Sequence, residues 1–101
     1  MKNTIKKIEE IIESIYIKEL LGVSIYDRLH IYTDLNDEVQ ELRRTALDYE
    51  LKVLSNQPYN DIRLKLVERI NAIHTIALTI EDYRMSYLFF NDQGMLNEEL
   101  I

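Results

Sequence analysis

The chain of 101 residues contains no cysteine and no tryptophan, and it has only two glycines and one proline. Without cysteine, no disulfide can stabilise a small secreted fold and no thiol can serve as a nucleophile. Glycine and proline are the residues that most often interrupt regular structure, so their scarcity predicts few turns and long elements. By its length the chain is expected to form a single domain, residues 1–101, around one hydrophobic core.

Long hydrophobic runs are also missing. The amino-terminal segment MKNTIKKIEEIIESIYI has lysines like those of a signal peptide, but Glu9, Glu10 and Glu13 interrupt its apolar residues. No stretch approaches the roughly 18–20 apolar residues that a membrane-spanning helix needs. We therefore expect a cytoplasmic protein without a membrane span.

Positive charge is the scarcer sign: the chain has 12 Lys and Arg against 18 Asp and Glu, for a net charge of −6. Binding to a nucleic-acid backbone requires clustered Lys and Arg to neutralise phosphates, so nucleic acid is not an expected partner. The abundance of Ile, Asn, Lys and Tyr is typical of AT-rich coding DNA, as in low-GC bacteria and their phages. We expect an acidic bacterial or phage protein.

The spacing of apolar residues at three- and four-residue steps predicts an all-α fold. The expected helices span about 3–21, 24–33, 34–55 and 61–90, and a tail follows at 91–101. The segment SNQPYND, residues 55–61, collects turn-forming residues between the two longest helices. We therefore expect an antiparallel helical bundle built on a long helical hairpin, with the first helix packed across it.

The sequence leaves open whether residues 24–55 form one helix or two. Thr33 or Asp34 can cap a new helix at this point. The three- and four-residue spacing of apolar side chains nevertheless continues through it, from Tyr32 to Val53. We favour a break or kink at Thr33-Asp34.

The last predicted helix, 61–90, is apolar on nearly all sides, with a narrow polar strip that includes Glu68 and Thr75. Such a helix is either the centre of its own bundle or half of a subunit interface. A chain this small cannot surround so long a helix, so we expect a homodimer. The residues expected at the interface are Val67, Leu78, Tyr83, Met85, Tyr87 and Phe89.

Two carboxylate pairs in residues 38–71 allow a different interpretation. Glu38-Val39-Gln40-Glu41 and Glu68-Arg69-Ile70-Asn71 resemble the ExxE and ExxD motifs of all-α NTP pyrophosphohydrolases of the MazG type. The resemblance implies Glu38, Glu41 and Glu68 as magnesium ligands in a hydrolase that releases pyrophosphate. Asn71 stands where the family has aspartate, and Glu68 points away from the apolar seam. Carboxylates in the first turns of a helix also need no metal, because the helix dipole favours negative charge there.

Two shorter spacings also match known sites. Arg69 and His74 have the Arg-x4-His spacing of HEPN ribonucleases, in which arginine stabilises phosphate charge and histidine transfers a proton. Asp27 and His30 could offer two ligands one helical turn apart, as in helical di-iron proteins, but no matching second motif is present. The structural interpretation of these residues is a boundary histidine and a solvated helix face.

Two classes of function are therefore weighed. The favoured one is a small non-enzymatic protein–protein interaction module that self-associates and binds an unknown protein partner through an acidic surface bearing some of its seven tyrosines. It would be an inhibitor, adaptor, immunity protein or phage-encoded modulator, with no catalytic residue, cofactor or metal. Pro58 and Arg63–Val67 resemble a region of bacteriocin immunity proteins from low-GC Gram-positive bacteria. The alternative is the MazG-like hydrolase, which uses magnesium.

Overall fold

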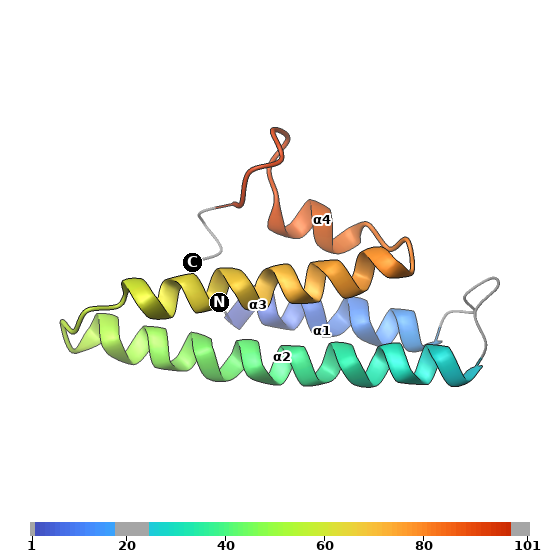
Figure 1. Cartoon of the computed structure of the whole chain (residues 1–101), viewed down its shortest axis with the longest axis horizontal. Helices are drawn as coiled ribbons and strands as arrows, with labels where there is room; N and C mark the ends of the chain where they lie inside the picture. The colour runs from blue at the N-terminus through green and yellow to red at the C-terminus, as the bar shows by residue number, and fades with distance from the viewer. Residues whose placement is uncertain (1, 18–24, 98–101) are drawn as a thin grey trace.

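The computed structural model describes residues 2–17 and 25–97. These residues form four helices: α1 (Lys2–Ile17), α2 (Ile25–Leu54), α3 (Asn60–Thr79) and α4 (Arg84–Phe89) (Figure 1). No β-strand occurs in these two segments, where the only strand-like pairing is an isolated bridge between Phe90 and Leu96. The structure confirms the all-α prediction.

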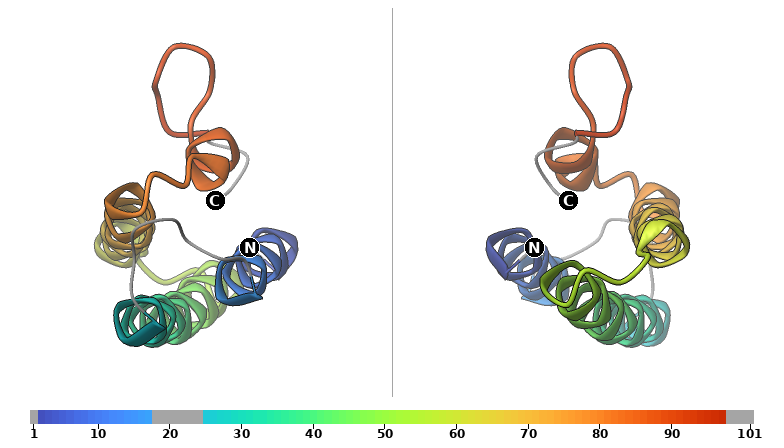
Figure 2. Two further views of the ribbon diagram at one scale, coloured as in Figure 1. Left: turned by 90° about the vertical axis from the view of Figure 1, so that its right-hand side faces the viewer. Right: turned by 90° about the vertical axis from the view of Figure 1, so that its left-hand side faces the viewer.

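The four helices pack against one another in an elongated molecule measuring 49 × 28 × 19 Å. The two longest helices, α2 and α3, lie side by side and run in opposite directions, while α1 packs against α2 and α4 packs against both α1 and α3 (Figures 1 and 2). The end of α2 and the start of α3 extend beyond α1 and α4 (Figure 1). This free end is covered on fewer sides than the rest of the molecule.

The core is a cluster of aliphatic side chains, to which α4 adds Met85 and the aromatic ring of Phe89. In α1, Ile5, Ile8, Ile12 and Ile15 recur at steps of three and four residues and are all buried, because these steps return to the same face of a helix. The remaining members of the cluster come from the other three helices: Leu35, Val39, Leu42, Ala46, Leu66, Ile70, Ile73, Ala77, Met85 and Phe89.

The predicted break at Thr33-Asp34 is wrong, because α2 continues through both residues. Tyr32 and Leu35 pack in or against the core on either side of this point, so tertiary contacts hold one helix face inward throughout. Thr33 does not cap a new helix; its hydroxyl donates to the carbonyl oxygen of Leu29, one turn earlier, at 2.9 Å. This bond is compatible with an uninterrupted helix.

The predicted helix 61–90 is also wrong, because it is divided between α3 and α4. At the end of α3, Glu81 has φ +57° and its N–H donates to Leu78 O at 3.0 Å. The N–H of Asp82 donates to Ala77 O at 3.1 Å. These two bonds form a Schellman motif, which ends a helix with one residue in the left-handed conformation. Glycine usually occupies that position, and the glutamate here gave no sequence signal for the break.

The prediction that the first helix reaches residue 21 and that the second begins at residue 24 lies outside the described residues. Within the described residues, α1 is followed to Ile17 and α2 from Ile25. None of the helices described is both long enough and apolar enough to cross a lipid bilayer.

Candidate interaction site

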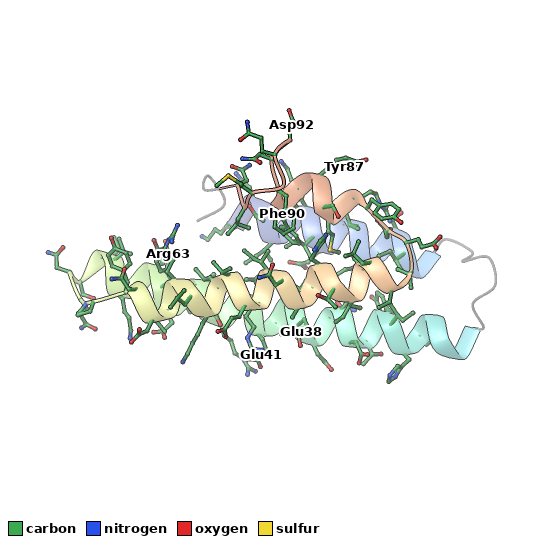
Figure 3. The ribbon with its side chains drawn as sticks, turned by 45° about the horizontal axis from the view of Figure 1, so that its top comes forward. Glu38, Glu41, Arg63, Tyr87, Phe90 and Asp92 are labelled. Carbon is green, nitrogen blue, oxygen red and sulfur yellow. The ribbon has the colours of Figure 1, made fainter. Side chains whose placement is uncertain are left out.

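The two carboxylates of α2 that resemble magnesium ligands face an arginine of α3. Glu38 and Glu41 lie one turn apart on α2 (Figure 3). Arg69 Nη1 lies 3.8 Å from Glu38 Oε2, and Arg69 Nη2 lies 3.8 Å from Glu41 Oε2. Arg44 Nη1 approaches Glu41 Oε1 at 3.2 Å. Arginine therefore supplies positive charge at the position where the resemblance places a metal ion.

Glu68, the third ligand that the resemblance implies, is exposed on α3 and does not join the other two. It is adjacent to Arg69 in sequence, so it is turned by about 100° around the helix from the side chain that faces α2. Among the residues that the structure describes, no group of three His, Asp or Glu side chains is placed to hold a metal ion. The predicted three-carboxylate site is therefore not assembled in this structure.

The ribonuclease-like pair is directed toward two different helices. Arg69 faces α2, whereas His74 Nε2 lies 2.6 Å from Ser86 Oγ of α4. The His74 ring centroid is 6.4 Å from that of Phe89 and 4.9 Å from that of Phe90. These partly buried aromatic surroundings indicate that His74 connects α3 to α4. Its pairing with Ser86 could not be recognised from the spacing of the residues.

His30, the second member of the di-iron-like pair, forms an exposed contact on its own helix. Its Nε2 atom lies 3.5 Å from Asp34 Oδ2, one turn further along α2. The side chain of Asp27 lies outside the described residues. The structure thus places His30 on a solvated helix face.

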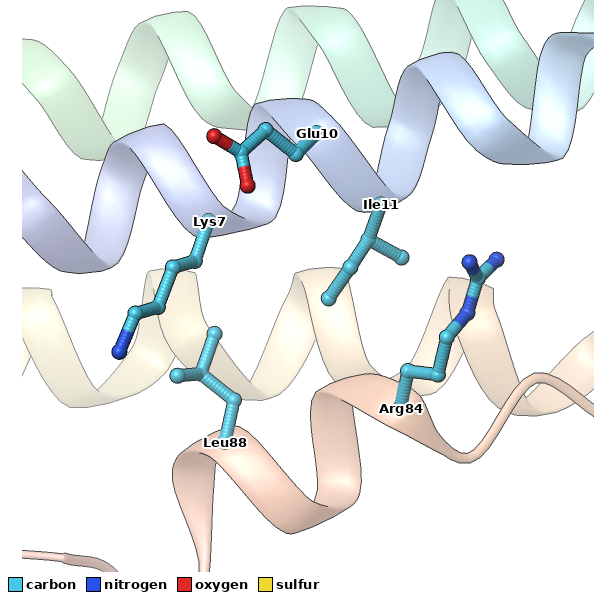
Figure 4. A pocket seen from close by; sticks show the side chains of 5 residues that line it. All are labelled: Lys7, Glu10, Ile11, Arg84 and Leu88. Atoms are coloured by element: carbon cyan, nitrogen blue, oxygen red, sulfur yellow. The ribbon is translucent and has the colours of Figure 1, made fainter.

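A shallow pocket of about 350 Å³ lies between α1 and α4 (Figure 4). Its lining residues are Lys7, Glu10, Ile11, Arg84 and Leu88. The guanidinium of Arg84 is already occupied, because it donates to Asp82 and, through Nη1, to Ser14 Oγ at 2.9 Å. Its hydrogen bonds to Asp82, together with the opposite charge of that carboxylate, raise the pKa of Arg84, although partial burial opposes the rise. The pocket is therefore bordered by an arginine that holds α4 to α1.

The six residues predicted at a dimer interface are separated by the fold. Met85 and Phe89 are fully buried inside the chain, because they belong to α4, which packs against α1 and α3. Val67 is half-buried. The other three are exposed: Leu78 at 41%, Tyr83 at 54% and Tyr87 at 85%. Tyr83, the N-cap residue of α4, and Tyr87 lie one turn apart, after the turn that ends α3. We call Leu78, Tyr83 and Tyr87 the corner surface.

A second apolar surface lies on the free end of α2. Leu47, Leu51 and Leu54 are 58%, 55% and 75% exposed, and their steps of four and three residues place them on one helix face. We call these three residues the leucine stripe. Their spacing was visible in the sequence, but only the fold shows that this face is uncovered. Large contiguous apolar patches on soluble proteins mark interaction sites.

Comparisons of the chain with protein-family models, curated proteins and solved structures found no match.

Proposed function

We propose that this chain is a small non-enzymatic protein–protein interaction module, based on the antiparallel α2–α3 hairpin, that self-associates and binds a protein partner. The observation that carries the proposal is the exposure of two separate groups of large apolar side chains, the corner surface and the leucine stripe, on a chain that also has a buried core. Its role would be that of an inhibitor, adaptor, immunity protein or modulator in the cytoplasm of a bacterium or phage-infected cell.

The corner surface suits a protein partner. Tyrosine is enriched at interfaces because its ring contributes a large contact area with few rotatable bonds, while its hydroxyl can still form a hydrogen bond. The bidentate contact between Arg84 and Asp82 supports the corner at the start of α4. Glu81 adds an exposed negative charge beside Tyr83. The chemistry of the corner fits a partner with an apolar surface bordered by basic residues.

The leucine stripe suits self-association. Fully burying a leucine contributes about 1.5–3 kcal/mol, so covering the exposed parts of the stripe on two copies would contribute roughly 6–11 kcal/mol. Losing the free movement of two molecules costs about 4–15 kcal/mol. The gain and the cost are of similar size, so we expect a weak dimer that forms only at elevated protein concentration.

Affinity capture tests partner binding. The wild-type chain and matched variants serve as baits, and the partner is sought in extracts of candidate bacteria and of phage-infected cells. The wild-type chain and a Leu64→Glu control, changed at an exposed leucine outside both surfaces, should retain the same protein. The double variant Tyr83→Ala, Tyr87→Ala should lose it, and the purified partner should show the same difference in direct binding. Equal retention by all three baits, or no retained protein in any extract, would count against the proposal.

A further inference from the structure

Two of the three leucines of the stripe, Leu47 and Leu51, face each other when a second copy of α2 runs antiparallel to the first. We infer that the stripe binds a second copy of the chain, with the two α2 helices antiparallel and Leu47 of each copy opposite Leu51 of the other. This inference rests on the self-association in the proposed function, and it names the surface and the register.

The geometry follows from the steps of four and three residues between Leu47, Leu51 and Leu54, which are those of the core positions of a coiled coil. A contact between identical copies about a two-fold axis must be complementary to itself. In the register with Leu47 opposite Leu51, both leucines are used twice, and Leu54 lies opposite Arg44. The aliphatic part of the Arg44 side chain can cover Leu54 while its guanidinium stays in water.

The shape of the molecule leaves this face accessible. The last turns of α2 extend beyond the ends of α1 and α4 (Figure 1), so a second helix can lie along the stripe without displacing either one. The stripe also lies away from the corner surface, because the end of α3 and the start of α4 are at the opposite end of the long axis (Figure 1). A dimer formed at the free ends therefore leaves the corner surfaces of both copies available.

The distribution of charge favours a contact between the free ends over a contact elsewhere. The charges of Arg43 and Arg44 are paired with Glu9 and Glu41. Residues 45–65, which include the free end, contain three Lys and Arg and three Asp and Glu, so this end carries no net charge although the chain as a whole carries −6. Two copies that meet here keep their acidic parts apart, which reduces the repulsion between like charges. Asp48 and Glu50 flank the stripe at the rim of the contact, where water and salt screen them.

Sedimentation velocity of the purified full chain over about 10–100 µM tests the surface. The wild type should shift from monomer to dimer over this range. Leu51→Glu should weaken the dimer at least about tenfold, while the matched Leu64→Glu variant should behave like the wild type. A wild type that stays monomeric, or a Leu51→Glu variant that still dimerises like the wild type, would overturn the inference. Unchanged circular dichroism of both variants ensures that folded chains are compared.

Cysteine cross-linking tests the register, because the chain has no cysteine of its own. A mixture of Leu47→Cys and Leu51→Cys chains should form an intermolecular disulfide more completely than either variant alone, since a disulfide requires Cα atoms about 4.4–6.8 Å apart. If Leu47→Cys chains alone form as much disulfide as the mixture, the result contradicts the antiparallel register.

The two proposals fail in different ways. A monomeric wild type that still binds a partner through Tyr83 and Tyr87 would remove the leucine-stripe dimer and leave partner binding intact. If the wild type is monomeric and Leu51→Glu no longer captures the partner, the stripe binds a different protein. That pair of results would overturn the second-copy inference.

Discussion

His74 of α3 and Ser86 of α4 are joined side chain to side chain, with 2.6 Å between the imidazole Nε2 and the hydroxyl oxygen. The contact is partly buried and lies beside the rings of Phe89 and Phe90. It closes the short helix α4 onto α3 after the turn at residues 80–83. The burial of Met85 and Phe89 depends on this closure, because both side chains come from α4.

Ser86→Ala should lower the free energy of unfolding by about 1–2 kcal/mol, because it leaves a partly buried imidazole nitrogen without its partner. Urea denaturation followed by circular dichroism measures the change. Thr75→Ala, on the exposed face of α3, is the control and should change stability by no more than about 0.5 kcal/mol. Equal effects of the two substitutions would show that the bond to His74 does not stabilise the fold.

Phe89→Ala should cost about 3–5 kcal/mol, since it empties a fully buried aromatic site in the core. Tyr87→Ala, two residues earlier in the same helix, should cost less than about 0.5 kcal/mol because Tyr87 is 85% exposed. Thermal and urea unfolding of the pair distinguish the observed fold from the predicted continuous helix. A small effect of Phe89→Ala on unfolding would argue that α4 is not docked on the core.

Glu81→Gly should raise the free energy of unfolding by about 0.5–1 kcal/mol. The residue has φ +57°, a left-handed conformation in which an L side chain is strained and glycine is not. The matched control is Glu68→Gly, the same change at an exposed position inside α3, which should cost about 1 kcal/mol. If both substitutions destabilise equally, α3 does not end in the Schellman turn.

Millimolar magnesium should leave the thermal unfolding temperature unchanged, because Arg69 faces Glu38 and Glu41 and Glu68 lies elsewhere. A ligand stabilises the folded state only when it binds that state, so a binding site would raise the midpoint. The opposing result is a magnesium-dependent increase that Glu38→Gln abolishes, together with release of pyrophosphate from a nucleoside triphosphate. That result would favour the MazG-like alternative over the proposed function.

The candidate surfaces could be predicted only in part. The sequence predicted Tyr83 and Tyr87 at an interface, and in the structure both side chains are exposed and so accessible to a partner. It placed Met85 and Phe89 at the same interface, whereas both are buried in the core. The apolar character of residues 61–90 was read correctly, but periodicity shows only that several faces of a segment are apolar. It does not show whether a second molecule or the chain itself covers them.

The sequence alone determined the helical character of the chain and the inward face of α1. Local spacing was sufficient there, because side chains three and four residues apart must share a helix face. The tertiary structure decided the continuity of α2 and the break between α3 and α4. Both depend on packing against residues distant in sequence, which supports a helix through Thr33 and makes a left-handed Glu81 tolerable. The exposure of Leu47, Leu51 and Leu54 was decided in the same way, because it depends on where the neighbouring helices end.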